Sequence, residues 1–310
     1  MAQRGAASPD NTARIMLVVL SLGWGTTWPV MRIALNEVPP FSMRVATMVV
    51  GVLTLASLTL LRRRTFALRG KRAAIHVVVA GFFNVVSFTV LTPFAQLQAA
   101  TSRVSILVYS MPIWATLMAR IFLHERITGM RAAAFVLCIA GLVVLILPLA
   151  TAGIPVGLLL ALCAALGWAA GTIYLKWADL HEEPMAVTFW QIVVGLVVIV
   201  ICQPLAEGRL HLWPIHTKTV AALVFAGAVG SGIAYFLWFE IVRRLSAMTA
   251  SLGVLSVPAV GVVSSVILLG ERPTLSDIAG FALILSASAC VLLAPGTPPD
   301  VAPLKRASTE

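Results

Sequence analysis

Ten long apolar segments account for most of the chain, and their few charged residues lie mainly near the segment ends. A helix needs roughly 20 apolar residues to cross the hydrocarbon core of a bilayer, which is about the length of each segment. Only 11% of all residues are charged, whereas a soluble chain carries about 25%. The segments are 15–34, 41–61, 74–95, 102–122, 131–148, 155–176, 185–205, 219–240, 248–269 and 276–294. This pattern predicts an all-α polytopic membrane protein with ten transmembrane helices.

An internal duplication divides the chain into two units. Residues 105–137 and 251–283 are identical at 12 of 33 positions, at an offset of 146 residues. Two unrelated apolar segments would agree at about one position in ten. Leu-Gly-Trp at 22–24 recurs at 166–168. Repeats of this kind indicate two copies of one structural unit. We therefore expect a leader at 1–14, five-helix repeats at 15–148 and 155–294, and a tail at 295–310.

The distribution of charge predicts how the two repeats are oriented. Because each repeat has five helices, the second one enters the membrane from the opposite side and is inverted. The loop at 62–72 contains six Lys and Arg residues, while the corresponding loop at 206–218 contains two. Cytoplasmic loops are rich in Lys and Arg, so we expect loop 62–72 and both termini to be cytoplasmic. Much of the net charge of +10 comes from basic residues in such loops. We therefore expect no nucleic-acid partner.

With this arrangement, the chain resembles the EamA family of the drug/metabolite transporter superfamily over about residues 15–294. The matching residues are Trp24 and Gly25, Arg44, Pro112 and Pro258, Glu125, Arg126 and Thr128, Glu271, Arg272 and Thr274, and Trp190 and Gln191. The resemblance implies a transporter of small metabolites, most often an exporter, in a bacterial-type inner membrane. Its partners would be a small-molecule solute and the lipid bilayer.

Two prolines at matching positions of the repeats are candidates for a hinge. Pro112 and Pro258 are 146 residues apart and lie inside apolar segments. A proline removes one backbone hydrogen bond from a helix. In transporters with inverted repeats, helix breaks at matching positions point to the substrate site. A packed kink is the alternative, because proline is common in transmembrane helices.

Polar and aromatic residues within the segments are the candidate substrate-binding residues. Such groups need a partner inside the bundle, either another helix or a ligand. The candidates are Trp24, Asn84, Ser87, Tyr109, Trp168, Tyr174, Gln191, Tyr235 and Ser256. Trp28, near a segment end, fits an interfacial aromatic belt better. The neutral-polar and aromatic character of the set suits an amino acid or a related metabolite.

Three charged residues are expected to brace the structure. Arg44 lies inside the second segment, with Gln191 at the corresponding place in the other repeat. Glu125 and Glu271 precede Thr128 and Thr274, the expected N-caps of the helices that follow. Thr274 and Asp277 also form the pattern of a capping box.

We expect no cofactor, no metal and no catalytic residue. The four cysteines lie in apolar segments, where a cysteine usually behaves as a small hydrophobic residue. No G-x-S-x-G or H-E-x-x-H motif is present. The leading interpretation is a secondary transporter with one central site between the repeats, which opens to each side in turn. The alternatives are an intramembrane enzyme or a channel, and the oligomeric state stays open.

Overall fold

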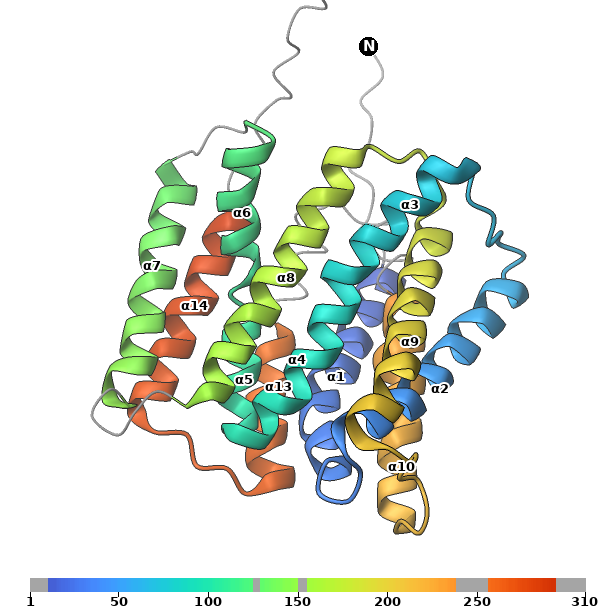
Figure 1. Ribbon diagram of the computed structural model, residues 1–310. Coiled ribbons are helices and arrows are strands. Elements are labelled where there is room, and N and C mark those ends of the chain that lie inside the picture. The colour runs from blue at the N-terminus through green and yellow to red at the C-terminus, as the bar shows by residue number, and fades with distance from the viewer. Residues whose placement is uncertain (1–10, 125–128, 150–154, 238–255, 294–310) are drawn as a thin grey trace, which may run out of the picture.

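The computed structural model describes residues 11–124, 129–149, 155–237 and 256–293, and every regular element among them is helical. Figure 1 shows these helices packed side by side in one bundle. In chain order they are α1 (Asn11–Ala34), α2 (Pro40–Leu61), α3 (Gly70–Gly81), η1 (Phe82–Val86), α4 (Ser87–Gln98), α5 (Thr101–Val108), α6 (Met111–Phe122), α7 (Gly129–Ile146), η2 (Leu147–Leu149), α8 (Val156–Ala178), α9 (Pro184–Glu207), α10 (Thr217–Phe225), η3 (Ala226–Ile233), α13 (Ser256–Leu269) and α14 (Leu275–Leu293).

Six helical stretches in the described residues are long and apolar enough to cross a membrane. They are Pro40–Leu61, Gly70–Gln98, Thr101–Phe122, Val156–Ala178, Pro184–Glu207 and Thr217–Leu237. Three shorter apolar helices lie at Ala132–Ile146, Val257–Leu269 and Leu275–Ala287. The part of the chain that the structure describes is therefore all-helical, with helices of membrane-spanning length, as the apolar segments predict.

The outer surface of the bundle exposes many large apolar side chains, and the largely apolar interior also contains buried polar residues. Large aliphatic side chains such as Leu60, Val136 and Ile267 are exposed, whereas Thr92 and Gln96 are buried. A water-soluble protein has the reverse tendency, and large exposed apolar surfaces mark contact with a membrane or a partner. This distribution fits a bundle surrounded by lipid.

Two helices that are matched by the duplication contain π-helical turns. Residues 82–86 form η1 between α3 and α4, and residues 226–233 form η3 after α10. Asn84 in the first and Gly230 in the second are 146 residues apart, the offset of the duplication. Short π-helical turns inside α-helices frequently occur at functional sites.

A break separates α5 from α6 close to Pro112. Helix α5 ends at Val108, Tyr109 is its C-cap, and Pro112 lies in the first turn of α6. Because proline has no N–H, the Val108 carbonyl receives no hydrogen bond from residue 112. The break therefore precedes the proline and places Tyr109 at the end of a helix rather than in its middle.

Helices from the two halves of the chain pack against each other throughout the bundle. Helix α1 packs against α13, α2 against η3 and α9, and α7 against α14, while α8 packs against α4, α5 and α6. Small residues permit some of these approaches. A Cβ atom at Gly227 would lie 2.6 Å from the Thr47 carbonyl oxygen, and one at Gly51 would lie 2.5 Å from the Cβ of Ser231. The α2–η3 interface thus depends on glycine at both positions.

Candidate functional site

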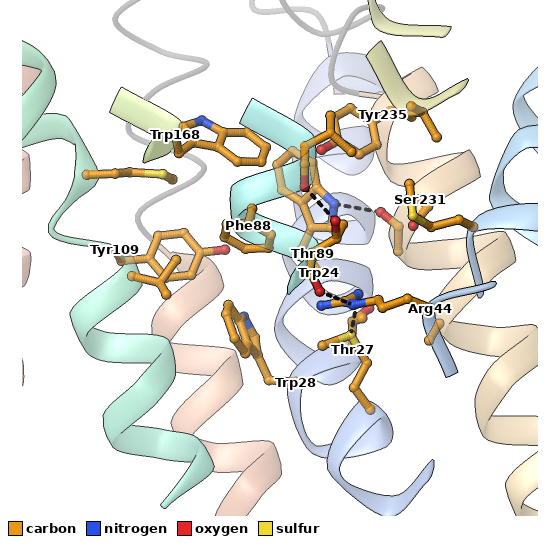
Figure 2. Close-up of a pocket in the computed structure, with 18 residues that line it drawn as sticks. Trp24, Thr27, Trp28, Arg44, Phe88, Thr89, Tyr109, Trp168, Ser231 and Tyr235 are labelled. Carbon is orange, nitrogen blue, oxygen red and sulfur yellow. Dashed lines mark hydrogen bonds between the residues drawn. The ribbon is translucent and has the colours of Figure 1, made fainter. Parts of the chain in front are cut away.

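A cavity of about 130 Å³ lies inside the bundle, and both halves of the chain line it. Its wall includes residues of α1, α2, η1, α4 and α5 from the first half, and of α8, α9 and η3 from the second. Six aromatic side chains contribute most of its character: Trp24, Trp28, Phe88, Tyr109, Trp168 and Tyr235. Figure 2 shows these rings around the space, with Arg44 on one side and Tyr109 on the opposite side.

The aromatic rings are held by contacts to one another and to the backbone. The Trp24 indole N–H donates a hydrogen bond to the Gly230 carbonyl oxygen at 3.0 Å. Its ring also meets Tyr235 edge to face, with centroids 5.7 Å apart. Phe88 contacts Trp168 at 5.1 Å and Trp28 at 6.1 Å in the same manner. Such pairs contribute about 0.5–1.5 kcal/mol each beyond their burial, so these contacts fix the shape of the wall.

Arg44 is the charged group of the cavity wall. Its side chain is 6% exposed. Its Nε donates to the Thr89 carbonyl oxygen at 2.9 Å, Nη2 to Thr92 Oγ1 at 2.6 Å, and Nη1 to Met31 Sδ at 3.4 Å. These bonds connect α2 to α4 and α1, so they support the expected bracing role, and they also hold the guanidinium beside the cavity.

Five of the residues predicted from the sequence lie together on this wall. Trp24, Tyr109, Trp168 and Tyr235 are there as predicted binding residues, and Arg44 joins them. They come from α1, α2, the α5–α6 break, α8 and the end of the α10–η3 helix. Their sequence separation is large, so only the packing of the two halves brings them together.

Four other predicted binding residues lie away from the cavity wall. The Asn84 amide donates from Nδ2 to Gln191 Oε1 at 3.0 Å, which joins η1 to α9. Ser87 bonds the Phe83 carbonyl within its own helix and packs against Gly167 of α8. The Tyr174 hydroxyl lies 2.8 Å from His76 Nδ1.

The remaining predicted residues are placed only in part. Pro258 is buried in the first described turn of α13, which begins at Ser256. A hinge role for Pro258 and Pro112 stays a prediction. Glu125 and the side chain of Ser256 lie outside the part of the chain that the structure describes. The Glu271 carboxylate accepts hydrogen bonds from the backbone N–H groups of Thr101 and Ser102 at 2.6 and 2.9 Å, so its partner is the start of α5.

One expectation about the aromatic residues is wrong. Trp28 is 6% exposed and forms part of the cavity wall, so it does not belong to an interfacial belt. The Trp28 carbonyl also accepts a hydrogen bond from Gln96 Nε2 at 2.9 Å. A signal was present in the sequence: Trp24 and Trp28 are four residues apart, and residues at that spacing share one face of a helix.

The cavity is also lined by Thr27, Phe88, Thr89 and Ser231, which no pattern in the sequence had indicated. Threonine and serine are frequent in transmembrane helices, where they often bond the preceding turn. Thr27 and Thr89 do so through the carbonyls of Gly23 and Val85. Nothing in the sequence distinguishes these threonines and Ser231 from the other hydroxyl residues of the apolar segments.

The described residues contain no group of three or more His, Cys, Asp or Glu side chains that could hold a metal ion. The four cysteines are free.

Comparisons with known proteins agree with this architecture. The chain matches the EamA-like transporter family twice, at residues 11–147 and 155–293. It is 23% identical over 278 residues to an uncharacterized transporter of Bacillus subtilis, covering 87% of this chain and 94% of that protein. It is also 23% identical over 292 residues to a protein of Escherichia coli named as a probable amino-acid metabolite efflux pump, covering 89% and 92% of the two chains.

A crystal structure of another protein shows the same fold. The two chains share 22% sequence identity and superpose with a TM-score of 0.65, over 91% of this chain and 96% of the other. Both halves of the chain match the family pattern, and the relatives match along most of their own length. The protein therefore belongs to the EamA-like transporter family, whose pattern it contains twice.

Proposed function

We propose that the protein is a secondary transporter that exports small metabolites, such as amino acids or related compounds, across the inner membrane. The central cavity is its solute site, and the two five-helix repeats rock against each other to open that site to each side in turn. The observation that carries the proposal is the cavity itself, because residues of both halves form its wall. A relative named as a probable amino-acid metabolite efflux pump supports the solute class and the direction.

The pattern of helix contacts supports two inverted repeats of five helices. Helix α1 packs against α13, and its counterpart α8 packs against α5 and α6. Helix α2 packs against η3, and its counterpart α9 packs against η1. Together, α1, the six long apolar stretches and the three shorter helices supply the ten spans of the proposal. Matching interfaces of this kind let one half move against the other around a fixed site.

The proposed energy source is the solute gradient, through facilitated transport or exchange. Proton carriers generally place a titratable carboxylate or histidine where both sides can reach it. Among the described residues, none of those that line the cavity is Asp, Glu or His.

Counterflow in liposomes tests the proposal. The purified protein is reconstituted, the vesicles are loaded with one unlabelled amino acid at a time, and uptake of the same labelled compound is followed. We expect saturable uptake that is faster in loaded vesicles than in empty ones. Unsaturable flux at the same rate in both kinds of vesicle would indicate a channel and contradict the proposal. As a control, the variant Trp177→Phe should transport normally, because Trp177 is an exposed residue of the helix that also contains Trp168.

A further inference from the structure

Arg44 is a buried cation without a carboxylate partner among the residues that the structure describes. Its three hydrogen bonds end on a backbone carbonyl, a threonine hydroxyl and a thioether sulfur. A buried charge without a counter-charge is expensive, and proteins retain one mainly where it is paired or functional. The position of Arg44 on the cavity wall makes a bound anion the group that can compensate its charge.

The hydrogen bonds of Arg44 leave part of the guanidinium available. Arginine has five N–H donors, and a thioether sulfur is only a weak acceptor. Nη1 and Nη2 each make one hydrogen bond and keep one N–H group without an acceptor in the described part of the chain. Carboxylates accept bonds from two guanidinium nitrogens at once, a geometry that lysine cannot reproduce. The bonds to Thr89 and Thr92 meanwhile hold the group in position.

The rest of the cavity suits the other part of such a solute. No carboxylate from the described chain lines it, and six aromatic rings do. An apolar side chain can pack against these rings. An ammonium group can also lie over an aromatic face, an interaction of about 0.5–2 kcal/mol. The ammonium group of an amino acid therefore has a place in the cavity without an acidic residue.

We propose that Arg44 binds the carboxylate of the solute and thereby selects monocarboxylates, amino acids included, over amines and uncharged amides. This inference rests on the proposed transport function and adds the group by which the solute is recognised. The carboxylate contributes most of the affinity, and the ammonium group contributes little.

The experiment compares four probes that differ in one group each. They are L-leucine, L-leucinamide, 3-methylbutylamine, which lacks the carboxylate, and 4-methylpentanoate, which lacks the ammonium. Binding to the purified protein is measured through the fluorescence of the cavity tryptophans, and the other proteinogenic amino acids and their amides are measured beside them. The two carboxylates should bind, and the amide and the amine should bind roughly 10- to 100-fold more weakly, as expected for the loss of a charge-assisted hydrogen bond.

Variants separate anion binding from a structural role of Arg44. In Arg44→Gln, the preference for the acid over its amide should vanish, and Arg44→Lys should keep part of it. Asn84→Ala is the matched control, because it removes a buried hydrogen bond between two helices but leaves the cavity wall intact. It should keep the preference. Thermal unfolding of each variant shows whether it is folded, and Arg44→Lys stands in if Arg44→Gln is not.

Three results would overturn the assignment. One is equal binding of the acids and the amides in the unaltered protein, and another is the same loss of preference in Asn84→Ala as in Arg44→Gln. The third is that no carboxylated compound binds. If solutes without an anionic group then show saturable counterflow, the transport function stands and only the role of Arg44 is wrong. If no solute shows counterflow, the transport function fails as well.

Discussion

Asn84 and Gln191 lie on different helices and bond to each other, although both are predicted binding residues. Both are less than 10% exposed, and the hydrogen bond joins Asn84 Nδ2 to Gln191 Oε1. Replacing either residue by alanine leaves a buried amide without its partner, which costs about 1–3 kcal/mol. We expect Asn84→Ala and Gln191→Ala each to lower the unfolding temperature in detergent. The double variant should lose less than the sum of both, and additive losses would contradict a direct interaction.

Trp168 offers a contrasting prediction about binding. Its ring lies on the cavity wall against Phe88, so Trp168→Ala should remove part of the surface that contacts the solute. The loss of an aromatic contact of about 1.5 kcal/mol weakens binding by roughly tenfold. KM in counterflow should therefore rise by about that factor, and the unfolding temperature should also fall because the ring contact with Phe88 is lost. Trp177→Ala on the same helix is exposed and should leave KM unchanged. Equal effects of both variants would contradict the location of the site.

At the scale of single residues, the sequence could identify candidates but could not select among them. A tryptophan or tyrosine inside an apolar segment is uncommon enough to suggest a function, and Trp24, Tyr109, Trp168 and Tyr235 do line the cavity. Asn84 also lies inside an apolar segment, but its side chain points to Gln191 of α9 and not into the cavity. That direction depends on how its helix packs against α8 and α9. Sequence position gives depth in the membrane but not this rotation.

At the scale of helices, carboxylates cap the starts of helices that belong to the other half of the chain. Glu271 accepts bonds from the first two N–H groups of α5, and Glu207 does the same for Phe41 and Ser42 of α2. Glu37 bonds the N–H of His216, just before α10, and this bond lowers the pKa of the Glu37 carboxyl. A negative charge near a helix N-terminus is favourable. These contacts join the two halves at the ends of the bundle.

Glu271→Ala tests the importance of such a cap. It removes both acceptors at the start of α5, and capping losses cost about 0.5–2 kcal/mol. The unfolding temperature should fall, and KM should rise because Val108, the last residue of α5, and its C-cap Tyr109 both lie on the cavity wall. Arg272→Ala is the matched control, because Arg272 is the next residue and its side chain is exposed. Substitutions of exposed residues usually change stability by less than about 0.5 kcal/mol. An unchanged unfolding temperature in Glu271→Ala would contradict the capping role.

Helix positions follow from the sequence better than helix irregularities do. The apolar segments coincide with helices wherever the structure describes them. A run of apolar residues favours lipid, where the backbone N–H and C=O groups have to bond each other and a helix satisfies them within the segment. The predicted capping box is confirmed: the N–H of Thr274 bonds the Asp277 carboxylate, and the N–H of Asp277 bonds the Thr274 hydroxyl. The π-helical turns η1 and η3 had no signal of this kind, because apart from Asn84 their residues are ordinary apolar and small ones.

At the scale of the whole molecule, the orientation in the membrane stays a prediction with a direct test. The α2–α3 and α9–α10 connections lie at opposite ends of the bundle in Figure 1. The first is strongly basic, so it should be cytoplasmic. In a background without the four native cysteines, Trp213→Cys should react with an impermeant maleimide added to intact cells, and Ala67→Cys should not. Both parent residues are exposed. The reverse labelling would overturn the orientation of both repeats.

The duplication predicts the arrangement of the two halves but not the cavity between them. Asn84 and Gly230 occupy matching positions of η1 and η3. The asparagine fills its interface by bonding Gln191, whereas Gly230 lies beside the cavity, as does Arg44, the counterpart of Gln191. Part of the cavity wall therefore comes from positions at which the two copies differ, and part comes from the matching residues Trp24 and Trp168. Similarity between the two copies alone therefore does not indicate at which interface the cavity forms.

The accessibility of Ser231 tests most directly whether the central cavity opens to both sides of the membrane. Ser231 lies on the cavity wall, and Ser231→Cys in the background without native cysteines is a small change. The measurement is the rate of reaction with an impermeant maleimide, added to intact cells and, separately, to inside-out vesicles. Alternating access predicts reaction from both sides, with a transported solute slowing both reactions. Reaction from neither side or from only one side, whatever solute is present, would contradict it.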